Sequence, residues 1–222
     1  MRGLPDMQSG FVRFIRRGAV ALAVLVSLSS AAQAACSRAA LPAAAAQPVR
    51  VNAPDQALFN AAVLAEVNYQ RCLKGLRSVR GDASLMRAAY MHSNWMASAG
   101  KLEHRSNVRG MRSLADRLNA ADVSYRTAAE NIGMVHRFRI DEGQRFFVRN
   151  TSACHFVNAS GNRIAPYSYG TLAQRVVVLW MESPGHRRNI LDRNMNKMGA
   201  ALGFDNDAQY CGQFYMTQNF AG

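Results

Sequence analysis

The sequence is poor in acidic residues and has no closely spaced cysteines, no internal repeat and no serine-hydrolase motif. Only 14 Asp and Glu residues stand against 27 Lys and Arg in 222 residues, which gives a net charge of +13. The absence of a Cys-x-x-Cys pair argues against a cysteine zinc site. The absence of a Gly-x-Ser-x-Gly pattern argues against an α/β-hydrolase nucleophile. What remains is a basic chain of single-domain size, whose 49% of hydrophobic residues is enough for a sizeable core.

The first 34 residues have the features of an export signal. Arg13, Arg16 and Arg17 form a positive region before the apolar run Ala19–Leu28, which is too short to span a bilayer. The following Ala32-Gln33-Ala34 fits the small-x-small pattern of a cleavage site. We therefore expect residues 1–34 to be a signal peptide cleaved after Ala34, and the mature chain to be secreted or periplasmic. A retained membrane anchor is the alternative.

Two other export routes rank below this one. Arg16-Arg17 suggests a twin-arginine signal, but the residues after the pair give it little support. Cys36 suggests a lipid anchor, but Gln33 stands where a lipid-attachment signal prefers an aliphatic residue.

The expected mature chain remains strongly basic and keeps every cysteine. Cleavage would remove four arginines and one aspartate, so the net charge falls from +13 to +10. Such a charge favours anionic partners of the cell envelope, namely lipid headgroups or wall polymers. Nucleic acid is not expected, because the protein is exported and its basic residues are scattered. An even number of cysteines in an exported chain predicts two disulfides, with the pairing left open: Cys36, Cys72, Cys154 and Cys211.

The periodicity predicts an α+β domain over residues 55–222. Residues 35–54 are rich in Ala and Pro and are expected to be a poorly ordered linker. Capping and spacing signals predict helices over residues 56–73, 83–99, 113–119 and 171–181, with a short helix after Pro184-Gly185. Strands at 198–204 and 214–220 form a predicted hairpin. Residues 136–170 lack periodicity and are interpreted as a long excursion held by a disulfide.

Three ionisable residues stand out from their local sequence context alone. Glu130 lies in an apolar run, where a buried acid needs a cation or hydrogen-bond donors, although a structural bond to backbone is an equal alternative. His186 follows the Pro184-Gly185 helix break and either enters a cleft or only packs. His92 lies in the apolar stripe of the second helix and is interpreted as a satisfied core histidine.

Five stretches taken together resemble the CAP superfamily, which comprises cysteine-rich secretory, antigen 5 and pathogenesis-related proteins. The bacterial SCP-like branch is the most similar, and the resemblance covers residues 56–221. It implies an α-β-α sandwich with a small antiparallel sheet between helices. The stretches are Asn68-Tyr69-Gln70-Arg71 with Gly75-Leu76 and Asp82–Leu85, His104, Ala129–Ile132, Trp180 with Ser183–Leu191, and Thr217–Phe220.

The resemblance also implies a cleft lined by two His and two Glu. His104, Glu130 and His186 match three of these positions. Ser183 stands where many members carry the second Glu, and Glu182 comes one residue too early, about 100° away around a helix. Two imidazoles and a carboxylate suit Zn²⁺ or another divalent cation, with His104 and His186 as ligands and Glu130 as a further candidate. The excursion over 136–170 could cover or extend this cleft.

Three functions are consistent with this pattern, each for a monomer. The first is a binding module outside the cytoplasm, whose His/Glu cleft holds a divalent cation or a small ligand. The second is a metal-dependent hydrolase of peptide or wall polymer, with Glu130 as candidate ligand or general base. The third is a lipid or sterol carrier, suggested by the aromatic residues of the excursion: Phe146, Phe147, Phe156, Tyr167 and Tyr169.

Overall fold

A computed structural model describes residues 36–140 and 142–222 of the chain. The predicted signal peptide and its cleavage site lie outside these residues. The chain divides into two compact units, Met1–Ser37 and Arg38–Gly222, and the fold below is that of the second. Within the described ranges, no helix combines the length and apolarity that crossing a membrane requires.

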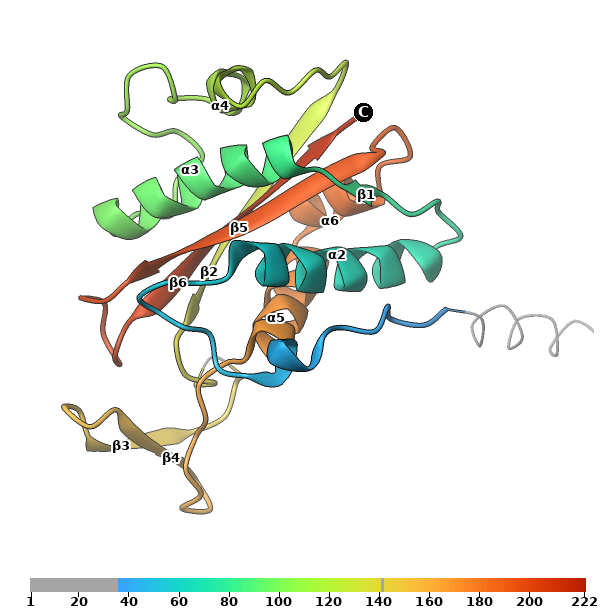
Figure 1. Cartoon of the computed structure of the whole chain (residues 1–222). Coiled ribbons are helices and arrows are strands. Elements are labelled where there is room, and N and C mark those ends of the chain that lie inside the picture. Colours follow the sequence, from blue (N-terminus) through green and yellow to red (C-terminus); the bar gives the residue numbers. More distant parts are fainter. Residues whose placement is uncertain (1–35, 141) are drawn as a thin grey trace, which may run out of the picture. The chain divides into compact units, whose positions relative to one another are not determined.

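A four-stranded sheet forms the centre of this unit, in the order β1-β5-β6-β2. The strands are β1 (Arg80–Gly81), β5 (Lys197–Asp205), β6 (Gln213–Ala221) and β2 (Ala128–His136). The β5–β6 hairpin is the one predicted from sequence. β2 pairs antiparallel with β6, and β1 pairs parallel with β5. β2 was not predicted, and it carries Glu130 at an outer edge of the sheet (Figure 1).

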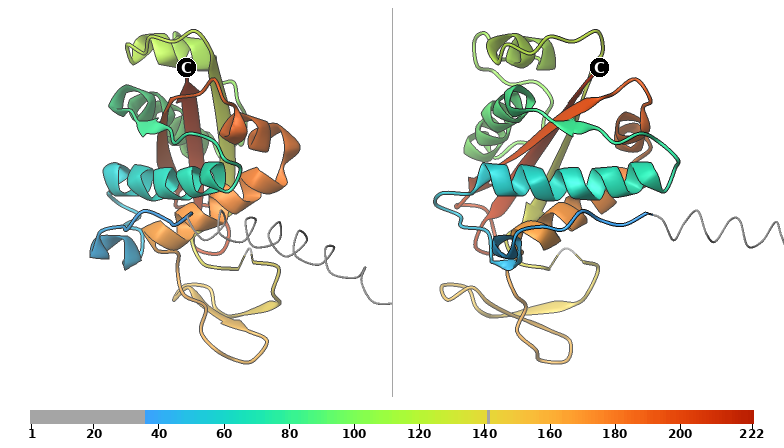
Figure 2. Two further views of the ribbon diagram at one scale, coloured as in Figure 1. Left: turned by 90° about the vertical axis from the view of Figure 1, so that its right-hand side faces the viewer. Right: turned by 45° about the vertical axis from the view of Figure 1, so that its right-hand side comes forward.

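Helices cover both faces of the sheet, which confirms the predicted α-β-α sandwich. α3 (Ala83–Ala99) and α4 (Leu114–Ala120) lie on one face, and α5 (Tyr169–Glu182) and α6 (Pro184–Leu191) lie on the other (Figure 2). α2 (Gln56–Cys72) packs with α5 and joins the main hydrophobic core.

The predicted helix ends are formed by the capping residues that signalled them. Asp55 accepts a hydrogen bond from the backbone N–H of Leu58 at the start of α2, and Asp82 does the same for Leu85 in α3. Gly100 ends α3 in the left-handed conformation, at φ 60°.

Two glycines of β5 allow α3 to lie unusually close to the sheet. A Cβ added at Gly199 would collide with the backbone of Leu85 and Met86, and one added at Gly203 would collide with the backbone of Ser93. Neither glycine is required by its backbone conformation. Their role is therefore close approach between layers, which brings α3 and its His92 against the sheet.

The Ala/Pro-rich segment differs from the loose linker expected from its composition. Its Ala43–Ala46 stretch forms a short 3-10 helix, η1, and Ala45 and Val49 are buried in the main core. The backbone N–H of Val49 donates to the carbonyl of Tyr167. Residues 43–49 therefore belong to the folded unit.

The excursion forms a small sheet of its own, β3 (Phe146–Asn150) and β4 (His155–Asn158). A disulfide joins Cys154 to Cys211 and holds this sheet to the end of the β5–β6 hairpin, as expected for a pinned excursion. Cys36 and Cys72 are also disulfide-bonded, and none of the four described cysteines is free. The small sheet lies at the end of β2 opposite to α4, so it does not cover the Glu130 region (Figure 1).

Candidate functional site

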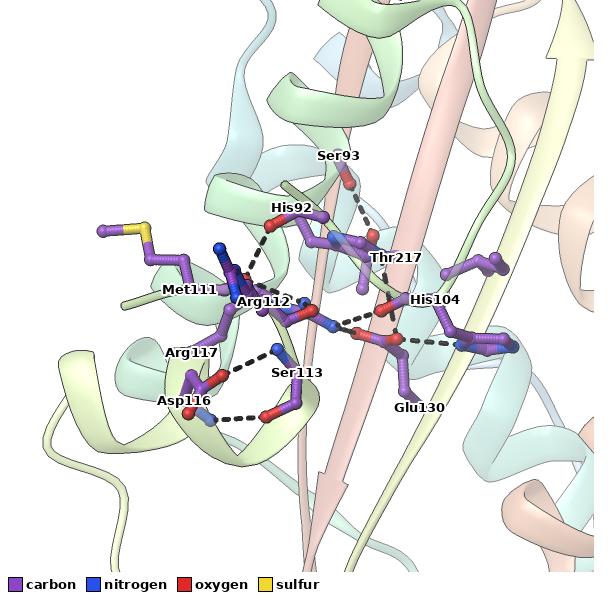
Figure 3. Close-up of polar contacts among 12 residues, drawn as sticks. His92, Ser93, His104, Met111, Arg112, Ser113, Asp116, Arg117, Glu130 and Thr217 are labelled. Atoms are coloured by element: carbon purple, nitrogen blue, oxygen red, sulfur yellow. Dashed lines mark hydrogen bonds and ion pairs between the residues drawn. The ribbon is translucent and has the colours of Figure 1, made fainter. Parts of the chain in front are cut away.

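The Glu130 carboxylate is the centre of the site. It is the third residue of β2, and only 4% of its side chain is exposed. Nδ1 of His104 lies 2.9 Å from Oε1, and Nη2 of Arg117 donates to Oε2 at 2.6 Å. The two partners approach the carboxylate from opposite sides (Figure 3). Each oxygen of this buried acid therefore has a donor, which is what burial of a charge requires.

Arg117 is the residue of this site that sequence reasoning missed. Its side chain is 1% exposed, and it also donates to the carbonyls of His104, Met111 and Arg112 at 3.2 to 3.3 Å. It thereby fastens the loop that carries His104 to α4. The available signal was its position three residues after Leu114 in a short amphipathic helix, on the face that points inward.

Glu130 is held in its ionised form. Burial acts to raise its pKa, but the hydrogen bond from His104 and the charge of Arg117 outweigh burial, and the pKa is lowered from its usual value. Because an ionised carboxylate only accepts hydrogen bonds, Nδ1 of His104 must carry a proton. Glu130 thus fixes the tautomer and the orientation of the His104 ring.

His92 lies behind Glu130, fully buried on α3. Its ring stacks on Trp95, with centroids 5.5 Å apart, and its Nε2 is 3.8 Å from Glu130 Oε1. The backbone of Glu103 is also near, but neither ring nitrogen makes a well-formed hydrogen bond. Burial lowers the pKa of His92 to about 4, although the Glu130 charge opposes this shift. The prediction of a core histidine is confirmed, and its nearest polar neighbours are the Glu130 carboxylate and the backbone of Glu103.

His186 lies in the first turn of α6, half-buried, and an amide network holds it beside β2. Asn131 donates to the backbone carbonyl of His186 at 3.2 Å. Asn189 donates to the Asn131 side-chain oxygen at 2.8 Å and to the Glu130 carbonyl at 3.3 Å. Burial lowers the pKa of His186, and the nearby His104 lowers it further. The structure therefore places the His104 ring against Glu130 and His186 near His104.

The two doubtful acid positions contribute no carboxylate to this group. Glu182 is the last residue of α5 and is exposed; within the described part of the chain it makes no side-chain hydrogen bond or ion pair. Ser183 is the junction of α5 and α6, and its side chain makes no capping bond to α6. The second Glu that many family members carry is therefore replaced neither by Ser183 nor by Glu182.

The residues present do not fit a three-ligand metal site. Across residues 36–140 and 142–222 there is no group of three His, Cys, Asp or Glu side chains placed to hold an ion. The physical reason lies at Glu130, whose oxygens already bond to Arg117 and His104. A cation ligated by Glu130 would have to compete with the buried guanidinium of Arg117 for the same carboxylate.

Comparisons with known proteins agree with the fold. The sequence model of the cysteine-rich secretory protein family, CAP, matches residues 64–220. An uncharacterised protein of Bacillus subtilis (strain 168), YkwD, is 27% identical over 132 residues, which cover 60% of this chain and only 37% of that protein.

A solved structure shows the same fold. An extracellular protein of Bacillus anthracis that contains an SCP domain aligns with a TM-score of 0.50 at 23% identity, over 75% of this chain and 41% of that one. An outer surface protein of Borrelia burgdorferi aligns with a TM-score of 0.48 at 14% identity, over 72% of this chain and 89% of that one. The chain thus spans well under half of the B. subtilis and B. anthracis proteins.

Proposed function

Since the chain belongs to the CAP family of cysteine-rich secretory proteins, we propose that it is an exported, non-catalytic binding module whose ligand contacts His104 and His186. The disulfides support export, because such bonds persist in oxidising compartments. The basic charge of the chain supports work at an anionic cell envelope.

The observation that carries the proposal is the fixed orientation of His104. Its Nδ1 is bound to Glu130, while 55% of its side chain remains exposed. Nε2 of His104 has no hydrogen-bond partner among the described residues and is free to meet a ligand. Because the pKa of His186 is lowered, its ring is neutral at pH 7 and offers one donor and one acceptor. Two such rings suit the hydroxyl and amide groups of a wall glycan or its peptides.

A hydrolase that uses Glu130 as its general base receives less support from this geometry. A general base works best with a pKa near the working pH, whereas the pKa of Glu130 is lowered and both its oxygens are engaged. Lipid carriage also receives less support, because the aromatic residues that suggested it pack into the protein. Phe156, Tyr167 and Tyr169 are at most 2% exposed, and only Phe147 is largely open at 49%.

A pelleting assay with isolated peptidoglycan tests the proposal. The wild-type chain should sediment with the polymer, and the double variant His104→Ala/His186→Ala should stay in solution. His155→Ala, which changes a histidine of β4 outside the site, should behave as wild type. The same samples are followed for released sugars and peptides. Equal sedimentation of the wild type and the double variant, or turnover that disappears in Glu130→Gln, contradicts the proposal.

A further inference from the structure

A cavity that shares no residue with the His104–Glu130 group lies between two loops at the C-terminal end of α2. Its volume is about 550 Å³, within the range of small-ligand pockets. One wall is residues 75–80, after α2, and the other is residues 193–196, after α6. Four of the nine lining residues are arginines, and no lining residue is acidic: Arg71, Gly75, Leu76, Arg77, Ser78, Arg80, Arg193, Met195 and Asn196.

Arg71 holds the two walls of this cavity together, and its hydrogen-bond donors are used in these contacts. It is 1% exposed, and its guanidinium donates to the carbonyl of Arg77 in one wall. It also donates to three carbonyls around the other wall, those of Ile190, Asp192 and Met195, at 2.7 to 3.3 Å. Because one rigid planar group fastens both loops, the cavity exists before any ligand arrives.

The other three arginines of the cavity do not form structural contacts of this kind. Arg77, Arg80 and Arg193 are exposed, and their side chains make no hydrogen bond or ion pair with any other described residue. The nearby acids are occupied elsewhere: Asp82 caps α3 and approaches Lys197, and the Asp192 side chain accepts from the backbone of Asn194. Three guanidinium groups therefore face one preformed cavity with their donors free.

We propose that this arginine cavity binds a phosphate group. Guanidinium groups match phosphate oxygens with pairs of parallel hydrogen bonds, and three of them around one cavity supply both the charge and the donors for a mono- or diester. An exported basic protein can meet this group on a lipid headgroup or on a soluble phosphate compound. The inference is independent of the ligand at His104 and His186.

Calorimetry with inorganic phosphate and with glycerol 3-phosphate tests the site, using the mature chain in a phosphate-free buffer. Arg77→Gln/Arg193→Gln should weaken binding about tenfold or more, because charge-assisted hydrogen bonds are lost. Arg145→Gln/Arg149→Gln removes the same charge from the exposed β3 region and is the matched control. His104→Ala/His186→Ala should bind phosphate as the wild type does. Thermal unfolding confirms that the variants are folded.

Vesicle sedimentation then identifies the source of the phosphate. If Arg77→Gln/Arg193→Gln also loses binding to phosphatidylglycerol vesicles relative to the control, the natural ligand is a lipid headgroup. If only calorimetric binding falls, the ligand is a soluble phosphate compound. Absence of phosphate binding by the wild type overturns the proposal, and so does an equal loss in the control variant, which would reflect overall charge.

Discussion

Replacing Arg117 with methionine should leave the Glu130 charge buried without its main counter-charge. The change preserves much of the side-chain volume but removes the 2.6 Å bond to Glu130 and the donors to three loop carbonyls. Breaking a buried ion pair on one side costs about 3–5 kcal/mol. Since a whole domain is stable by about 5–15 kcal/mol, the variant should fold but with a much reduced free energy of unfolding.

The pH dependence of this loss is the more specific prediction. In the wild type the pKa of Glu130 is below its unfolded value, so the stability from its charge is present above the unfolded pKa. That stability is lost as the pH falls through the folded pKa. In Arg117→Met the charge that opposed the effect of burial on the Glu130 pKa is gone, and we expect the folded pKa of Glu130 to rise above the unfolded value. Protonation of Glu130 then removes the buried unpaired charge from the variant. The difference in the free energy of unfolding between the two proteins should therefore narrow from pH 7 to pH 5.

Urea unfolding followed by tryptophan fluorescence measures this gap at both pH values. Arg112→Met is the control, because Arg112 is exposed in the same loop and should change stability by less than about 0.5 kcal/mol. The double variant Arg117→Met/Glu130→Gln should be more stable than the sum of the single costs implies, since it leaves no unpaired charge. A gap that is the same at pH 7 and pH 5, together with additive costs, would refute this account of the site.

Three further predictions concern His92, the contact between α3 and the sheet, and the disulfide of the excursion. His92→Leu should reduce the loss of folding stability in acid by up to about 3 kcal/mol. In the wild type, burial of the neutral His92 ring contributes stability above its unfolded pKa of 6.5, and this contribution is lost as the pH falls to about 4. Urea titrations from pH 7 to 4 measure it, and parallel curves would contradict it. Gly199→Ala should destabilise by about 1–3 kcal/mol through collision with α3, whereas Gly185→Ala in α6, where a Cβ has room, should be neutral or slightly stabilising in thermal melts. Cys154→Ser/Cys211→Ser should cost about 2–4 kcal/mol and increase proteolysis within residues 136–170, and equal protease resistance would argue against a pinning role.

The sequence was most informative where local chemistry alone decides the structure. Asp55, Asp82 and Gly100 signal helix ends through hydrogen bonds and backbone conformations that involve only neighbouring residues, and all three were found in those roles. The β2 strand was missed because Ala128–His136 has no clear alternation of polar and apolar residues. Its strand character comes from pairing with β6, 77 to 93 residues away in the chain, which no local pattern reports.

The candidate site shows the same division between local and tertiary information. Glu130 was found because an acid in an apolar run needs a partner, and the pattern of the family added His104 and His186. Arg117 was missed because its role depends on how α4 packs over β2. An arginine in a short amphipathic helix is ordinarily a solvated residue, and only the tertiary contact turns it into the counter-charge of the site.

The position of Arg117 also explains why the two binding regions should respond differently to salt. At the His104–Glu130 site the carboxylate is neutralised internally by a guanidinium that is 1% exposed, so the surface offers hydrogen bonds with little net charge. At the arginine cavity the Arg71 guanidinium is hydrogen-bonded to carbonyl groups and lies near the charge of Asp192, but Arg77, Arg80 and Arg193 present uncompensated charge to solvent. Screening at 0.15 M ionic strength acts over about 8 Å and weakens exposed charges far more than buried pairs. The phosphate site should therefore lose affinity as salt rises, while contact with a neutral wall polymer through the imidazoles should persist.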